Sequence, residues 1–195
     1  MAPKFVVAEI MDLFALHGAE DYDGEPVSQA SHMMQCALIA EVETGDADLV
    51  VAGLLHDIGH LLKQEPHTET MYGFGVVNHE LLGGAYLRAR GFSPRVCSIV
   101  ENHVAAKRYL VAKDEDYRRK LSPASLVTLQ WQGGAMGANE ARLFEQLPFF
   151  NDIIAVRRWD ELGKDTMVLV PPPTYFEPVI LQHLMRQEYL YASNY

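Results

Sequence analysis

The chain of 195 residues is poor in cysteine, in positive charge and in long apolar runs. Its two cysteines, Cys36 and Cys97, are too few for a disulfide framework, so we expect a reducing compartment and place the protein in the cytoplasm. The first residues, 1–5, lack the apolar core of a signal peptide. No apolar run reaches the length of a membrane span, so we expect no membrane association.

Positive charge is scarce because 26 acidic residues face 16 lysines and arginines, which gives a formal net charge of −10. A negative field of this kind disfavours binding to nucleic acid or to anionic lipid, so we expect neither as a partner. It also repels an anionic substrate, which would need a local site of positive charge. Hydrophobic residues make up 49% of the chain, enough for the core of one domain, which we place at residues 1–195.

Apolar residues recur at helical spacing along most of the chain, and no strand-like alternation extends beyond a few residues. The charged segment 114–120 is typical of a solvated face. We expect helices over residues 5–16, 29–42, 49–60, 76–90, 94–103, 123–132, 148–160 and 176–191, and a short amphipathic stretch over 138–147. The sequence therefore predicts an all-α fold.

The most informative stretch is the end of the apolar run 49–55, which leads directly into His56, Asp57 and, one turn later, His60. Desolvating an unpaired carboxylate costs several kcal/mol, so a buried helix does not end this way without compensation. A metal ion supplies it, because carboxylate oxygen and neutral imidazole nitrogen are its natural ligands. The alternative is a pair of surface histidines beside a helix-terminal aspartate.

Four further candidate ligands lie on or at the ends of other expected helices: His32, His79, His103 and Asp160. Each of them, taken alone, is more simply a core or surface residue. Together with the central histidine–aspartate pair they form a series from separate helices, which independent structural roles do not explain. The sequence therefore favours a metal centre built from several helices.

This series resembles that of the HD-domain metalloproteins, from the loop before His32 to Asp160. The resemblance implies a single helical bundle. It implies that one metal is held by four side chains, His32, His56, Asp57 and Asp160. It also implies that a second metal is held by His79, His103 and Asp57, with Asp57 bridging the two.

More residues narrow the resemblance: Tyr22 and Glu25 in one loop, Lys107, and the segment 122–134. They are similar to the mixed-valent diiron oxygenases, and within them to the enzymes that cleave the carbon–phosphorus bond of 1-hydroxy-2-aminoethylphosphonates. The resemblance implies two iron ions, Fe(II) and Fe(III), and O₂ as co-substrate. It implies an upstream hydroxylase that installs the substrate hydroxyl.

The segment 122–134 carries Ser125, Thr128 and Gln132 at about one-turn spacing, so one helix face offers two hydroxyls and an amide to an anion. Lys107 adds a point charge for the phosphonate, and His60 a hydrogen bond. The alternative is that Ser125 caps its helix and Thr128 packs.

By the same resemblance, Tyr22 occupies an iron site in the resting enzyme and withdraws when substrate binds, while Glu25 senses the substrate's cationic nitrogen. From the residues alone this loop is an ordinary surface turn.

The identity of the amine depends on the acidic loop, where Asp23 stands between Tyr22 and Glu25. Aromatic candidates are Tyr72, Tyr109, Trp131 and Trp159. A quaternary ammonium donates no hydrogen bond and is held by carboxylates and aromatic faces. We therefore favour 1-hydroxy-2-(trimethylammonio)ethylphosphonate as substrate, giving glycine betaine and phosphate. The unmethylated amine, giving glycine and phosphate, is the alternative.

Three other functions compete with this interpretation. An HD-type nucleotide phosphohydrolase needs only the four-ligand set, and some hydrolases hold two metals. A diiron oxygenase acting on a cyclitol would have little use for Lys107 and the hydroxyl-bearing helix. A catalytically silent HD domain used for binding would not require a complete set of metal ligands.

Overall fold

The computed structural model describes residues 1–22, 24–62 and 76–193. These ranges hold eleven α-helices, one 3-10 helix and an isolated bridge between Asp21 and Ser28, but no β-strand, which confirms the all-α prediction. The elements are α1 (Pro3–His17), α2 (Gln29–Thr44), α3 (Ala47–Leu55), α4 (Ile58–Leu61), α5 (His79–Ala89), α6 (Pro94–Lys113), α7 (Glu115–Lys120), α8 (Pro123–Trp131), α9 (Ala138–Phe144), α10 (Phe150–Leu162), η1 (Pro173–Phe176) and α11 (Glu177–Ser193).

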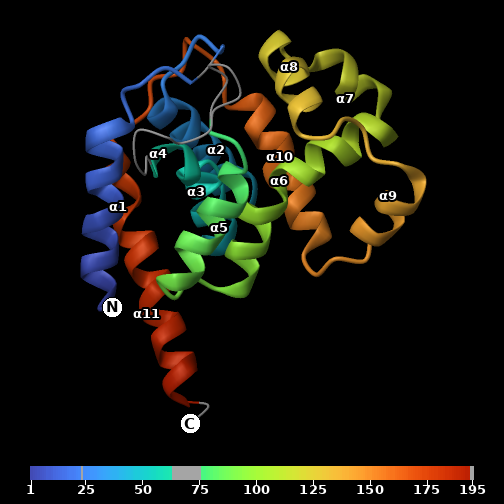
Figure 1. The fold of residues 1–195 in the computed structure, drawn as a ribbon. Coiled ribbons are helices and arrows are strands. Elements are labelled where there is room, and N and C mark those ends of the chain that lie inside the picture. The colour runs from blue at the N-terminus through green and yellow to red at the C-terminus, as the bar shows by residue number, and fades with distance from the viewer. Residues whose placement is uncertain (23, 63–75, 194–195) are drawn as a thin grey trace.

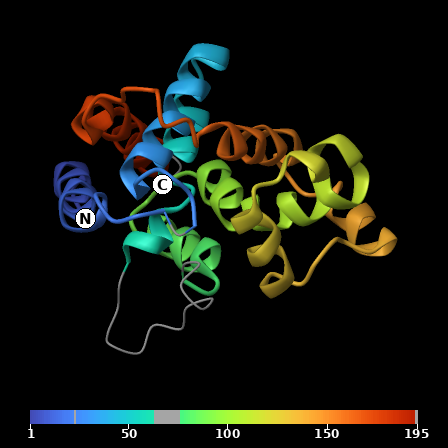
Figure 2. The same ribbon diagram turned by 90° about the horizontal axis from the view of Figure 1, so that it is seen from above.

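The centre of the molecule is a bundle in which α2 packs on α3, α5 on α6, and α10 on both α2 and α6. Helices α1 and α11 flank it on one side and α7, α8 and α9 on the other (Figures 1 and 2). Fully buried side chains such as Met33, Leu54, Ile99 and Ile153 fill the space between the central helices. No helix within the described ranges combines the length and apolar character that a membrane crossing requires. That residues 1–195 form a single domain stays a prediction.

Side-chain caps fix where the site-bearing helices begin. Ser28 accepts from the Ser31 amide at the start of α2, and Asp46 accepts from two amides at the start of α3. Ser93 and Ser122 cap α6 and α8 in the same way, each with proline as the first helical residue. Such caps satisfy amides that have no partner inside the helix.

Several expected boundaries were wrong. Helix α6 does not end near residue 103 but runs to Lys113, because Val104, Ala106 and Leu110 continue its buried face. The charged segment 114–120 is not only a solvated face. It contains the short helix α7, whose Tyr117 is buried and accepts a hydrogen bond from Arg157 Nε at 2.7 Å.

The expected helix over 49–60 is two helices with a break between them. Helix α3 ends at Leu55 and α4 begins at Ile58, with Asp57 between them at φ −103° and ψ 15°. His56 keeps helical backbone angles, φ −58° and ψ −36°, at the end of α3, whereas Asp57 leaves the helix. The break therefore lets two adjacent residues point at one centre, which a continuous helix would separate by about 100°.

Candidate metal centre

The six side chains predicted as metal ligands lie together in the middle of the bundle, and each is at most 4% exposed. They come from five elements: His32 from α2, His56 and Asp57 from the α3–α4 break, His79 from the start of α5, His103 from α6 and Asp160 from α10. Their convergence depends on the packing of α2, α5, α6 and α10 around α3 and α4.

The first group consists of His32, His56, Asp57 and Asp160. His32 Nε2 lies 3.1 Å from His56 Nε2, 3.5 Å from Asp57 Oδ2 and 3.5 Å from Asp160 Oδ1. His56 Nε2 lies 3.4 Å from Asp57 Oδ2. Neighbouring ligands about 2.1 Å from one ion lie about 3.0–3.5 Å from each other, and these contacts have that spacing. The contact between His56 Nε2 and Asp160 Oδ2 is longer, at 3.8 Å.

The second group uses the other oxygen of the same aspartate. Asp57 Oδ1 lies 3.3 Å from His79 Nε2 and 3.2 Å from His103 Nε2, and these two nitrogens are 3.1 Å apart. Asp57 thus turns one carboxylate oxygen to each group. This is the arrangement of a carboxylate that bridges two metal ions.

The position of the proton on each of the four histidine rings shows why a cation fits between their Nε2 atoms. Nδ1 of His32, His56, His79 and His103 lies 2.8–3.2 Å from a backbone carbonyl oxygen, of Gly163, Gly53, Val76 and Val100 respectively. A carbonyl only accepts, so each Nδ1 carries a proton, and each ring in its neutral form turns a lone pair outward at Nε2. Two facing lone pairs at 3.1 Å repel unless a proton or a metal ion lies between them.

The carboxylates of Asp57 and Asp160 also indicate that a metal ion binds here. Both oxygens of Asp57 and Oδ1 of Asp160 are buried without a hydrogen-bond partner among the described residues. Burial raises the pKa of Asp57, but the neighbouring histidines outweigh it and hold the pKa well below its usual range, so the carboxylate is charged. Buried charge without a partner is costly, and a divalent or trivalent cation removes the cost. The residues present therefore fit a metal centre.

Cys36 lies beside this centre and is not suited to be a ligand. It offers a sulfur near nitrogen atoms of His32 and His56. However, burial and the charges of Asp160 and Asp57 raise the pKa of the thiol well above its usual value, and Sγ donates to the Trp159 carbonyl at 3.6 Å. Metals bind the thiolate, so the protonated Cys36 serves to pack α2 against α10.

A cavity of about 40 Å³ opens next to the two groups. It is lined by the predicted residues Tyr22, Glu25, Asp57, His60, His79, His103, Lys107, Ser125, Thr128, Gln132 and Asp160. It is also lined by five residues that were not predicted, Gln29, Val104, Ala124, Arg157 and Lys164. This volume holds a few water molecules but no amino acid or phosphonate, so the walls must move before a substrate binds.

Tyr22 fills much of the space beside the first group. Its ring stacks on His32 with a centroid distance of 4.1 Å and an interplanar angle of 13°. Burial and the charges of Asp57 and Asp160 raise the pKa of Tyr22 well above its usual value, so the phenol keeps its proton. The predicted loop residue Asp23 lies outside the described residues.

His60 lies on the other side of Asp57 and stacks on His79 with a centroid distance of 3.9 Å. The Val76 amide donates to His60 Nδ1 at 3.1 Å, so the ring proton is on Nε2. Burial and the adjacent His79 lower the pKa of His60 well below its usual value. His60 is therefore a neutral hydrogen-bond donor.

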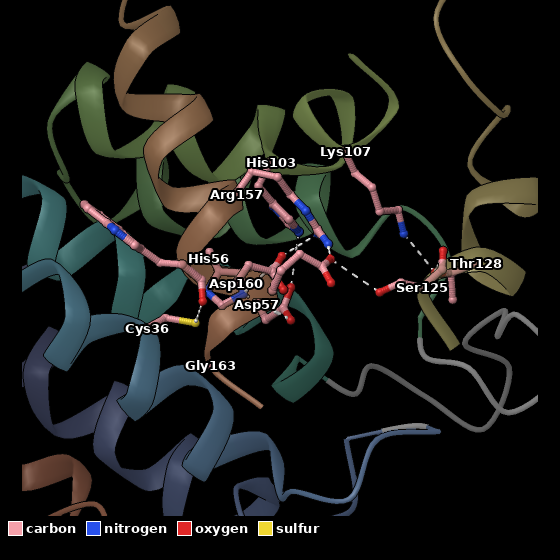
Figure 3. Close-up of polar contacts among 12 residues, drawn as sticks. Cys36, His56, Asp57, His103, Lys107, Ser125, Thr128, Arg157, Asp160 and Gly163 are labelled. Carbon is pink, nitrogen blue, oxygen red and sulfur yellow. Dashed lines mark hydrogen bonds and ion pairs between the residues drawn. The ribbon is translucent and has the colours of Figure 1, made fainter. Parts of the chain in front are cut away.

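Basic side chains line one wall of the cavity, and Figure 3 shows two of them, Lys107 and Arg157. Lys107 Nζ donates to Thr128 Oγ1 at 2.9 Å, and Arg157 Nη1 donates to Asp160 Oδ2 at 2.5 Å (Figure 3). Burial lowers the pKa of Lys107 well below its usual value, a cost that an anion in the cavity would reduce. Lys164 completes the group. Arg157 and Lys164 are already paired with acidic side chains, whereas Lys107 donates to a hydroxyl. Lys107 is therefore the cation of this wall that an anionic ligand would meet.

The hydroxyl-bearing helix is α8. Its polar residues were expected either to bind an anion or to cap and pack the helix. Ser122, not Ser125, caps the helix, and Ser125 Oγ lies 3.1 Å from Lys164 Nζ. Thr128 Oγ1 donates to the Ala124 carbonyl while it accepts from Lys107. Oε1 of Gln132 is buried without a partner among the described residues, as is Oε1 of Gln29 across the cavity.

The aromatic residues proposed to hold the amine do not line this cavity, or lie outside the described residues. Tyr109 packs against Phe144 and Phe150, and Trp159 donates to Glu43 at 2.8 Å. Trp131 is 56% exposed and lines a second, neighbouring cavity. Tyr72 lies outside the described residues.

The family profile described as "HD domain" matches residues 30–129, about half of the chain, and this range includes five of the six predicted ligands, all except Asp160. The chain belongs to the HD-domain family. The profile begins just before His32 and takes in the His56–Asp57 pair, His79 and His103, while Asp160 follows it along the chain.

Three relatives of known sequence extend the match over nearly the whole HD-domain chain. A [1-hydroxy-2-(trimethylamino)ethyl]phosphonate dioxygenase (glycine-betaine-forming) of Leisingera caerulea is 39% identical over 180 residues, 90% of this chain and 88% of the relative. A hydroxymethylphosphonate dioxygenase of Gimesia maris is 36% identical over 165 residues, 85% and 81% of the two chains. An uncharacterised protein of Acanthamoeba polyphaga mimivirus is 37% identical over 178 residues, 91% and 81%. We conclude that this HD-domain chain is a metal-binding enzyme.

Proposed function

We propose that the chain is a non-haem diiron oxygenase that uses O₂ to cleave the carbon–phosphorus bond of a 1-hydroxyalkylphosphonate. The observation that carries the proposal is the carboxylate of Asp57, with one oxygen toward each histidine group, beside a cavity with a wall of positive charge. The dioxygenase names of the two bacterial relatives support the same reaction.

Iron suits the donor set, because imidazole nitrogen and carboxylate oxygen without thiolate are typical ligands of non-haem iron. His32, His56, Asp57 and Asp160 would hold one ion, and Asp57, His79 and His103 the other. When bound, the iron pair supplies the binding and activation of O₂. The second group offers only three protein ligands, which leaves room for substrate oxygens.

The residues of the positive wall would hold the phosphonate. Lys107 carries the charge and is positioned by Thr128. Ser125 would add a hydroxyl, and the Nε2 proton of His60 would donate to the headgroup. These contacts would direct the carbon that bears the hydroxyl toward the metal centre. Orientation of this kind lowers the barrier without any covalent bond to the protein.

Tyr22 would exclude water and O₂ until substrate arrives. Its ring stacks on a metal ligand and helps reduce the cavity to about 40 Å³, so binding requires the loop of Tyr22 to move. Coupling access to substrate binding prevents oxidation of an empty site.

The reaction balances without an external reductant. A phosphonate R–CH(OH)–PO₃H₂ and O₂ give the acid R–COOH and phosphoric acid. The carbon–phosphorus and carbon–hydrogen bonds break, the carbon is oxidised to a carboxyl group, and O₂ is reduced. For the trimethylammonio substrate that we favour, the product is glycine betaine. The hydroxyl must be installed beforehand, so an upstream hydroxylase is implied, and we place both enzymes in the cytoplasm.

One experiment tests the reaction. Iron-loaded protein is given 1-hydroxy-2-(trimethylammonio)ethylphosphonate, its unmethylated analogue or hydroxymethylphosphonate, in ¹⁸O₂ or under argon. We expect phosphate release only with oxygen, and ¹⁸O in the products. H79A should lose the activity, and H17A, which changes a partly exposed histidine of α1 paired with Glu20, should keep it. Equal phosphate release under argon, or release from nucleotides, would instead support the phosphohydrolase alternative.

A further inference from the structure

We infer that Lys164 sets the preference of the cavity between cationic and neutral substrate tails, because it already occupies the carboxylate of Glu25. The inference rests on the proposed function. It assigns to Lys164 a positioning role that acts through Glu25.

Lys164 lies just after α10, one turn beyond Asp160, and its side chain is 11% exposed. Its Nζ lies 3.0 Å from Glu25 Oε1, 3.1 Å from Ser125 Oγ and 3.4 Å from Glu161 Oε2. It is 6.0 Å from the centroid of the Tyr22 ring. The ammonium thus stands between the loop that carries Glu25 and the helix that carries Ser125.

Glu25 is equally enclosed, with a side chain that is 8% exposed. Its Oε1 accepts from Lys164 Nζ and from Ser122 Oγ, the residue that caps α8. In the substrate-free molecule, therefore, Glu25 is not a free anion that waits for a cation but one partner of a buried ion pair.

A substrate that brings a cationic nitrogen to Glu25 must displace Lys164 or lie beside it. Like charges repel strongly where little water screens them, so the lysine penalises a cationic tail. A neutral tail leaves the pair intact. Lys164 can be released because Glu161 and Ser125 remain as acceptors, and Glu161 is already held by Arg157.

The two bacterial relatives illustrate the choice. The name of one specifies a trimethylamino group at the tail, and that of the other a hydroxymethylphosphonate, which has no nitrogen. The pair of Glu25 and Lys164 is therefore expected to decide how strongly this chain discriminates between these two kinds of phosphonate.

The test compares two ligands of equal shape that differ in charge, 2-(trimethylammonio)ethylphosphonate and 3,3-dimethylbutylphosphonate. Their affinities for the iron-loaded protein are measured by calorimetry without oxygen. We expect K164M to raise the ratio of affinities, cationic over neutral, about tenfold, because the competitor for Glu25 is removed. K164R, which keeps the charge, should restore the wild-type ratio, and E25Q should lower it. K113M, which changes a lysine that pairs with Glu145 away from the cavity, is the matched control.

An unchanged ratio in K164M overturns the inference. If the ratio is unchanged because both affinities fall equally, Lys164 is a direct ligand of the phosphonate instead. If K164M does not fold, K164Q serves the same comparison. Because binding is measured without oxygen, this result is independent of the oxygen-dependent release of phosphate that tests the proposed function.

Discussion

Replacing Gly59 with alanine should remove one of the two metal ions that we propose for the centre. Gly59 lies in α4, two residues after Asp57, where the backbone of α5 passes very close. A Cβ on Gly59 would lie 2.0 Å from the carbonyl oxygen of His79 and 2.9 Å from its Cα. Non-bonded contacts of a Cβ start at about 3.0 Å, so the two segments must separate by about 1 Å.

That displacement acts directly on a metal ligand. A metal–nitrogen bond of about 2.1 Å does not survive a shift of about 1 Å, so the group of His79 and His103 should lose its ion. The group of His32, His56, Asp57 and Asp160 has no ligand on α5 and should keep its own ion. Alanine favours a helix over glycine by about 0.5–1 kcal/mol, but overpacking costs about 1–3 kcal/mol, so the clash dominates.

We therefore expect G59A to bind one metal ion per chain instead of two and to lose activity about 100-fold or more. Metal analysis, phosphate release and urea unfolding measure the three effects. G137A is the matched control, because its Cβ would meet no atom within 4 Å and its backbone, at φ −72°, suits alanine. A G59A protein with two metal ions and the wild-type rate would refute the reasoning.

Two further substitutions test buried charges, one beside the candidate metal centre and one away from it. R157M should destabilise the metal-free protein by about 3–5 kcal/mol, because Asp160 loses its ion pair, and bound metal should recover part of the loss in thermal unfolding. An R157M protein as stable as wild type without metal would contradict this. Burial raises the pKa of Asp48, but His183 and Arg186 outweigh it and lower the pKa to about 2. The folded pKa lies below the unfolded value of about 3.9, so the stabilisation is present above about pH 4 and is lost as the pH falls toward 2. D48N should thus cost about 1–2 kcal/mol at pH 7 and almost nothing at pH 2, and a cost independent of pH would exclude this origin.

Much of the site was predictable because its chemistry is unusual for a helical core. Histidines and aspartates within apolar helices are costly to bury unless a ligand compensates them, so His56 and Asp57 stand out in the sequence. The caps at Ser28 and Ser93 are equally local signals. The side chains themselves converge through helix packing, which no local pattern specifies.

The unpredicted residues share one property: their buried state depends on partners far along the chain. Arg157 looks like a solvent-facing arginine of an amphipathic helix, although its spacing of three residues from Asp160 is a signal that could have been used. Lys164 is buried by Glu25 and Ser125, which are at least 39 residues away in sequence. The extension of α6 was missed because Lys107 and Arg108 interrupt its apolar pattern, yet Lys107 is buried.

The most direct test is anomalous X-ray scattering at the iron edge from crystals grown with iron. We expect two peaks, one on either side of the Asp57 carboxylate, with His32, His56 and Asp160 around one and His79 and His103 around the other. A single peak at saturating iron, or two peaks that do not share Asp57, would contradict a centre bridged by this residue.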